Sequence, residues 1–154
     1  MDRDSIPLSR RGLARRLTVQ AIYQWLVNET PPEKLMRQFH EDPGLGRADR
    51  DYFHGLLHGV VREAGLLTDT FEEYLDRALE QLDPVERAVL LLGSYELMFR
   101  PEVPWKVVVN ESVNLTKMFG AEESFKYINA VLDKVARTVR AVEVAGGTPG
   151  APPA

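Results

Sequence analysis

Apolar residues recur every three or four positions along most of the chain, the spacing that places them on one face of an α-helix. In the first half this pattern predicts four helices, within residues 13–27, 35–39, 53–64 and 68–82. Gly65 is the expected break between the last two helices, because glycine commonly follows a helix end. Thr68 or Asp69 is the expected N-cap of the fourth helix.

The second half opens with a compact helix-start signal, Asp83-Pro84-Val85-Glu86. Asp83 can cap the helix, Pro84 suits its first position, and Glu86 stands where a capping box has its carboxylate. Helical spacing returns in residues 105–113 and 125–142, although the valines of the first stretch also favour strands. The pattern thus predicts an all-α, single-domain bundle of about seven helices.

Composition limits the classes of function. The 154 residues suit one domain, and the absence of cysteine excludes disulfides, thiolate nucleophiles and cysteine-ligated metals. No apolar run approaches the roughly 18 residues that span a bilayer, and the N-terminus lacks a secretory signal. We therefore expect a cytoplasmic protein with no membrane partner. Its expected parts are a flexible arm (residues 1–9), a helical domain (10–142) and a disordered Pro/Gly-rich tail (143–154).

Motifs of catalysis and cofactor binding are absent. The sequence has no phosphate-binding P-loop, no dinucleotide-binding glycine pattern and no nucleophile elbow. His54 and His58 stand four residues apart on a predicted helix, a spacing that could hold a metal ion from one face. No further ligand accompanies them, so we interpret them as surface histidines. The sequence predicts no enzyme activity, no metal and no cofactor.

Charge is distributed unevenly along the chain. Residues 1–16 hold five arginines against two aspartates, a net charge of +3, whereas residues 66–96 hold eight acids against two bases, a net charge of −6. This asymmetry is consistent with a polyanionic partner at the N-terminus and a basic partner at the middle. Two solvated surfaces would give the same pattern, so charge alone leaves both interpretations open.

The arginine-rich segment has the residue types of an RNA-binding helix. Arg11 and Arg15 stand one helical turn apart, as do Arg16 and Gln20, and Arg10 comes just before the predicted helix. Guanidinium groups bind phosphates bidentately, and a glutamine amide can read a base edge. Tyrosines at the margins of apolar stripes, Tyr23 and Tyr74, could stack on bases, whereas core packing is the favoured interpretation of Phe119. Solvent-exposed arginines without any RNA role remain the alternative.

Six stretches of the sequence resemble the NusB family of bacterial transcription antitermination factors. They fall in the family's order between about residues 10 and 140: Arg15–Trp25, Leu82–Leu90, Tyr95–Leu97, Val103–Glu111, Lys117–Glu122 and Asn129–Val135. The resemblance implies an all-helical domain with a binding role. Such proteins associate with the ribosomal protein NusE, and the pair binds the single-stranded boxA element of nascent RNA. This recruits other Nus factors to RNA polymerase, so that ribosomal RNA operons are transcribed without premature termination.

The resemblance also implies two sets of site residues. The RNA-binding set comprises Arg10, Arg11, Arg15, Arg16 and Gln20, with Tyr74 as a further candidate. The protein-partner set comprises Tyr23, Glu80, Glu86, Glu123 and Tyr127. An acidic surface facing a basic ribosomal protein would aid encounter and specificity. Glu86 also has a structural role, closing the capping box, and the two roles are compatible.

The chain departs from the family pattern in two places. Gly12 and Leu13 interrupt the basic cluster, and Arg16 stands where an acid is expected.

One alternative function is an accessory module of ribosomal RNA processing or methylation, which the lack of a Rossmann-like segment disfavours. Another is a helical interaction protein that never touches RNA, for which the exposure of Arg11 and Arg15 on one face is the discriminating observation. The sequence leaves open whether the free chain forms a homodimer.

Overall fold

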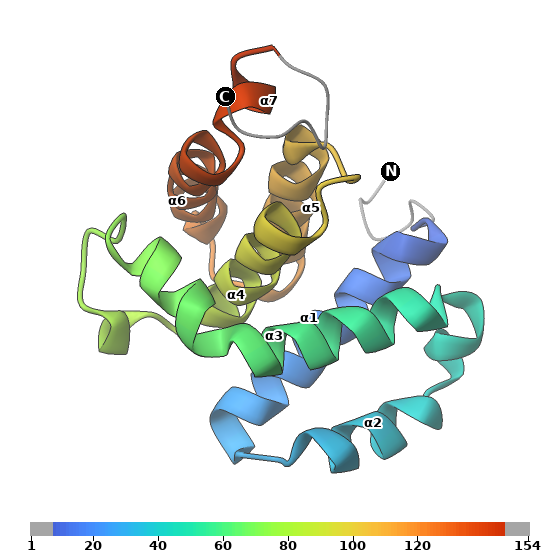
Figure 1. The fold of residues 1–154 in the computed structure, drawn as a ribbon. Helices are drawn as coiled ribbons and strands as arrows, with labels where there is room; N and C mark the ends of the chain where they lie inside the picture. Colours follow the sequence, from blue (N-terminus) through green and yellow to red (C-terminus); the bar gives the residue numbers. More distant parts are fainter. Residues whose placement is uncertain (1–7, 147–154) are drawn as a thin grey trace.

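The structure, a computed structural model, describes residues 8–146, and within this range every regular element is a helix (Figure 1). The α-helices are α1 (Arg10–Asn28), α2 (Pro32–His40), α3 (Arg50–Glu72), α4 (Pro84–Phe99), α5 (Trp105–Phe119), α6 (Ser124–Val139) and α7 (Ala141–Val144). Two short 3-10 helices, η2 (Pro43–Arg47) and η3 (Leu79–Gln81), lie in the connections. The predicted all-α class is confirmed. None of the helices described is long and apolar enough to cross a membrane.

Helix α4 forms the centre of the bundle. Eleven of its sixteen residues are buried, including every position from Ala88 to Leu97. A helix that is apolar on nearly all sides needs neighbours all around it. Accordingly, α1 and α3 pack against α4 from one side and α5 and α6 from the other, while α2 packs on α1 and α3 (Figure 1).

The start of α4 follows the capping signal in its sequence. The Asp83 carboxylate accepts a hydrogen bond from the Glu86 backbone N at 2.8 Å, and the Glu86 carboxylate accepts one from the Asp83 backbone N at 3.2 Å. These two bonds satisfy backbone donors that would otherwise have no partner at a helix start. The predicted capping box is confirmed.

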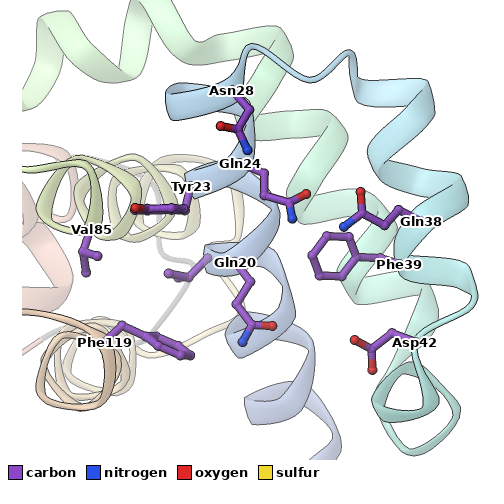
Figure 2. A pocket seen from close by; sticks show the side chains of 10 residues that line it. Gln20, Tyr23, Gln24, Asn28, Gln38, Phe39, Asp42, Val85 and Phe119 are labelled. Atoms are coloured by element: carbon purple, nitrogen blue, oxygen red, sulfur yellow. The ribbon is translucent and has the colours of Figure 1, made fainter.

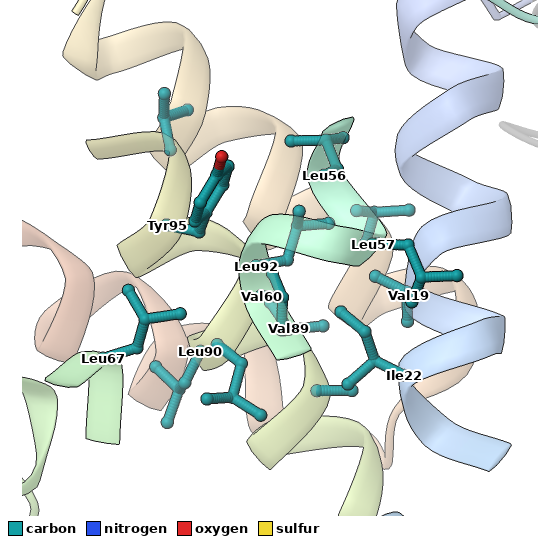
Figure 3. Close-up of a cluster of buried hydrophobic side chains, with 14 of the residues drawn as sticks. Val19, Ile22, Leu56, Leu57, Val60, Leu67, Val89, Leu90, Leu92 and Tyr95 are labelled. Carbon is teal, nitrogen blue, oxygen red and sulfur yellow. The ribbon is translucent and has the colours of Figure 1, made fainter. Parts of the chain in front are cut away.

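Side chains of α1, α3 and α4 interlock in the largest part of the core (Figure 3). Ile22, Leu57, Val60 and Val89 meet there and are fully buried. Gly59 allows α3 to approach α4 closely, since a Cβ at this position would lie 2.2 Å from the ring of Tyr95. A larger residue at this position would require the Tyr95 ring or the two helices to move.

The predicted break at Gly65 is wrong, because α3 runs without interruption to Glu72. Val60, Leu67 and Phe71 keep helical spacing across the glycine and are fully buried. Their burial outweighs the roughly 1 kcal/mol by which glycine disfavours a helix interior. Thr68 is therefore not an N-cap, and its hydroxyl donates to the carbonyl of Ala64 within the same helix. The helix predicted over residues 68–82 is therefore wrong as a separate element: its start belongs to α3, residues 73–78 are not helical, and residues 79–81 form the 3-10 helix η3.

The end of the domain also differs from the prediction. The last long helix ends at Val139, and α7 follows after a change of direction at Arg140. The Arg140 guanidinium is buried and donates to four backbone carbonyls, those of Glu96, Leu97, Arg100 and Val103, and to the Glu143 carboxylate. Glu143 is itself buried, so the packed domain extends beyond the boundary expected at residue 142. Most of the predicted tail, and nearly all of the predicted arm, lies outside the described residues.

Candidate nucleic-acid interface

The first turn of α1 carries two exposed arginines that are tied to the start of α3. Ser9 caps α1, with its hydroxyl accepting from the Gly12 backbone N at 2.9 Å. The Asp49 backbone N donates to the Arg10 carbonyl at 3.0 Å, and the Arg11 guanidinium lies 3.8 Å from the Asp49 carboxylate. Both guanidinium groups remain open to solvent at the edge of the bundle.

Guanidinium groups from two elements lie over the ring of Tyr52 beside this edge. The Arg11 guanidinium lies 4.2 Å from the centre of the Tyr52 ring, and the Arg100 guanidinium lies 5.0 Å from it. Both distances suit cation–π contacts, which hold a guanidinium in a restricted position. Arg100 was not expected here from the sequence, because it follows α4 and lies 89 positions after Arg11. Only the fold brings the two together.

The prediction that Arg15 shares the exposed face of Arg11 is wrong. Arg15 is 4% exposed, and its guanidinium donates three hydrogen bonds of 2.8–3.1 Å to the Glu96 carboxylate of α4. The Tyr52 hydroxyl donates to the same carboxylate. Burial and the Glu96 charge raise the pKa of Tyr52 above its ordinary value. Burial alone would lower the pKa of Arg15, but its bonds to Glu96 raise it, so Arg15 stays charged and paired inside the bundle.

A polar stripe continues along the outer face of α1. Arg16, Gln20 and Tyr23 follow at helical spacing, and Tyr23 is 40% exposed. Beside this stripe a groove of about 630 Å³ separates α1 from α2, from the start of α4 and from the end of α5 (Figure 2). We call it the α1 groove; its walls are Val19, Gln20, Tyr23, Gln24, Asn28, Gln38, Phe39, Asp42, Val85 and Phe119. Amide groups and aromatic rings therefore line one continuous concave surface.

The α1 groove joins residues from the two predicted sets. Gln20 from the RNA-binding set and Tyr23 from the partner set both line it (Figure 2). Phe119, which was expected in the core, is half-buried and faces the groove, with the Arg16 guanidinium 5.9 Å from its ring centre. An aromatic ring beside an arginine and an amide is an arrangement that suits an unpaired base.

Tyr74 does not join the α1 arginines. It follows α3, whose other end holds Asp49 against Arg11, and 23 helical residues rise about 35 Å. The Tyr74 hydroxyl instead lies 2.6 Å from that of Thr138 on α6. The structure thus places Tyr74 with the residues predicted to contact the partner.

Three residues of the partner set lie around α6 and η3. Glu80 and Glu123 are exposed, and Glu123 pairs with Lys126. Tyr127 is half-buried; its hydroxyl accepts from the Asp76 backbone N at 3.2 Å, and the Arg77 guanidinium lies 4.1 Å from its ring centre. Burial raises the pKa of Tyr127, so its hydroxyl is protonated near neutral pH.

Glu86 is the exception in the partner set, because it is only 5% exposed. Its carboxylate closes the capping box described above, which satisfies a backbone donor rather than facing solvent. Its role as a cap is therefore confirmed, and a contact with the partner stays a prediction for this nearly buried side chain.

The two histidines of α3 differ in environment. His58 is exposed as predicted, whereas His54 is half-buried with its ring centre 5.0 Å from that of His40. Burial, followed by the charges of His40 and His58, lowers the pKa of His54. Among residues 8–146, no group of three or more histidine or carboxylate side chains could hold a metal ion.

Comparison with known proteins identifies the family. The sequence model of the NusB family matches residues 13–137. The chain is 50% identical to the transcription antitermination protein NusB of Ralstonia nicotianae over 139 residues, which cover 90% of each protein. It is 46% identical to the NusB of Alcanivorax borkumensis over 149 residues, 97% of this chain and 99% of the other. A crystal structure of antitermination factors NusB and NusE in complex with dsRNA contains a chain with a TM-score of 0.77 and 26% identity, covering 84% of this chain and 97% of that one. This chain belongs to the NusB family.

Proposed function

We propose that this chain is an RNA-binding transcription antitermination factor. Together with the ribosomal protein NusE it binds boxA RNA and supports read-through transcription of ribosomal RNA operons. The observation that carries this proposal is the outer face of α1, where Arg16 and Gln20 lie beside the α1 groove, with Arg10 and Arg11 exposed at the start of the same helix. Membership of the NusB family, and the fold shared with a chain of a NusB–NusE–RNA complex, support it.

The chemistry of the α1 face suits a single strand. Exposed guanidinium groups neutralise phosphates, and the groove offers amides and rings to bases that are not paired. A phosphodiester backbone winding along α1 would meet Arg10 and Arg11 first and Arg16 about one and a half turns later. Sequence preference would then come from Gln20 and the groove, since phosphate contacts alone do not read sequence.

The NusE surface in this proposal comprises Glu80, Glu123, Tyr127 and Tyr23. The first three lie around η3 and α6, and Tyr23 lies in the α1 groove, so NusE would approach the groove from the side of α4 and α5. The bound pair would recruit other Nus factors and RNA polymerase in the cytoplasm. The role is binding without catalysis, and a homodimer of the free chain would compete with these contacts if it covered α1.

Fluorescence anisotropy with a labelled boxA-like RNA tests the proposal. The RNA is offered single-stranded, as a duplex and in a scrambled sequence, with and without NusE, at 50 and 200 mM salt. We expect the single-stranded boxA-like RNA to bind most tightly, and NusE to strengthen this binding because it adds RNA-contacting surface. Three phosphate contacts predict a log–log salt slope near −2 for the chain alone.

The matched variants are Arg11→Gln on the α1 face and Arg62→Gln on α3. Both remove one exposed arginine, and within residues 8–146 Arg62 forms an ion pair only with its neighbour Glu63. Only Arg11→Gln should weaken RNA binding. Absence of RNA binding with NusE present would refute the proposal and favour a protein-interaction module. Binding without preference for the boxA-like sequence would reduce the role to generic electrostatics.

A further inference from the structure

A second, smaller recess lies beside the α1 groove, between α1 and η2. Its volume is about 360 Å³, and it shares Gln20 and Asp42 with the groove. Leu13, Leu17 and Pro43 give it an apolar floor, while Arg16 and Arg47 supply its two positive charges. We call it the η2 recess.

Both arginines of the η2 recess are exposed, and neither forms an ion pair with another residue of the described chain. Other arginines of the domain are held by carboxylates or carbonyls, for example Arg140 and Arg137. Arg16 and Arg47 come from different elements, α1 and η2, and meet only because η2 packs on α1. Unpaired guanidinium groups on two sides of one recess are available to bind an anion.

The charge of the recess indicates which anion fits. Asp42 contributes one carboxylate against the two guanidinium groups, so the recess has a net charge of +1. One Asp42 oxygen accepts from the Gly44 backbone N at 2.7 Å, and the other makes no hydrogen bond within residues 8–146. A phosphodiester carries a single negative charge and matches this balance better than a dianionic phosphate group. The free carboxylate oxygen would accept from an exocyclic amino group of a base, as aspartate does with cytosine.

We propose that the η2 recess binds one nucleotide of the RNA strand, with its phosphodiester between Arg16 and Arg47 and an amino-bearing base against Asp42. The strand would then continue from the arginines of the first turn, past Gln20, onto η2. This inference rests on the proposed function and extends it to η2, a segment that the sequence analysis did not associate with RNA.

The test uses boxA-like oligonucleotides in which one linkage at a time is replaced by an uncharged methylphosphonate. For the wild-type protein, several linkages should weaken binding when neutralised. Arg47→Gln should bind the unmodified RNA about five- to tenfold more weakly, and it should lose sensitivity at one linkage while keeping it at the others. Arg62→Gln serves as the charge-matched control and should behave like the wild type.

Asp42→Asn tests the base contact. Asparagine keeps an oxygen that can accept from the Gly44 backbone N, so η2 keeps its cap. In the wild type, uracil at the nucleotide next to the Arg47-sensitive linkage should bind about tenfold more weakly than cytosine. Asp42→Asn should reduce this preference for cytosine over uracil, because an amide can donate to the uracil carbonyl.

The outcomes separate this inference from the proposed function. If Arg11→Gln weakens binding while Arg47→Gln matches the wild type at every linkage, the recess proposal is overturned and the antitermination role stands. Equal losses at all linkages in Arg47→Gln would also overturn it, since that result describes a long-range charge effect. No RNA binding by the wild type would overturn both proposals together.

Discussion

Arg11 and Arg15 stand one helical turn apart on α1, but one side chain is exposed and the other is buried. Arg11 is exposed at the edge of the bundle, where it lies over the ring of Tyr52. Arg15 is buried against the same tyrosine and bonded to Glu96. Both point to the same side of α1, but Arg11 lies in the first turn at the edge of the bundle, and Arg15 lies one turn further in, where α3 and α4 cover it. One arginine is therefore available to RNA, whereas the other belongs to the architecture of the bundle.

Removing the inner arginine should have the largest effect in the molecule. Arg15→Met leaves the Glu96 carboxylate buried with only the Tyr52 hydroxyl as partner. Breaking a buried pair in this way costs about 3–5 kcal/mol of unfolding free energy. Urea denaturation followed by circular dichroism should show this loss of unfolding free energy. Thermal unfolding should show a melting temperature lower by about 10 °C or more.

A double variant separates lost charge pairing from lost packing. In Arg15→Met/Glu96→Leu no unpaired charge remains inside the bundle, and apolar replacements of buried pairs are often neutral. We expect the double variant to be more stable than Arg15→Met alone. If the two variants are equally unstable, Arg15 contributes through packing and the ion-pair argument is contradicted.

Arg140 offers the second largest effect and a different kind of buried arginine. Its guanidinium satisfies backbone carbonyls at the end of α4 and after it, and Glu143 in turn accepts from the Trp105 backbone N at the start of α5. Arg140→Met should cost about 2–4 kcal/mol, since several buried carbonyls lose their donor. Arg140→Lys should recover part of the loss in the same denaturation experiment. A loss below that of an exposed control, Arg137→Met, would contradict this role.

Local signals predicted the parts of the fold that depend on neighbours in sequence. The capping box at Asp83 and Glu86 is one example, because its bonds join residues three apart. Gly65 is the opposite case, in which burial of Leu67 and Phe71 against other helices overrides a local helix breaker. The break at Arg140 depends on carbonyls some 40 positions earlier, which no periodicity reveals.

The candidate site likewise contains residues that spacing along one helix predicts and residues that only the packing of different elements brings together. Spacing on α1 correctly grouped Arg16 with Gln20, since both line the α1 face. It could not show that Arg15 has a carboxylate 81 positions away, or that Tyr74 lies at the far end of α3. Arg47 and Arg100 carry no periodic signal, and only the packing of η2 and α4 on α1 and α3 places them beside this face.

The outer arginine should affect binding and leave stability nearly unchanged. Arg11→Gln removes a weak ion pair with Asp49 and a cation–π contact at an exposed position, worth about 1 kcal/mol or less to folding. RNA affinity should fall by about three- to tenfold, with a salt slope shallower by about 0.7. Denaturation and anisotropy on the same samples measure both quantities. A stability loss comparable to that of Arg15→Met would remove the distinction between the two arginines.

His54 should show the smallest effect, and it represents a third condition, a buried polar atom without a partner. Its Nε2 is buried and makes no hydrogen bond within the described chain, unlike the fully bonded guanidinium of Arg15. Because burial and the charges of His40 and His58 lower the pKa of His54, the unfolded chain takes up a proton more readily than the folded one. This difference destabilises the fold as the pH falls below about 6.5, the ordinary histidine value, and it is absent well above that pH.

The wild type should therefore lose slightly more stability than His54→Gln between pH 7.5 and 5.5, in urea denaturation at both pH values. The exposed His58→Gln serves as the control, and parallel pH dependence of the wild type and His54→Gln would show that the buried ring carries no penalty.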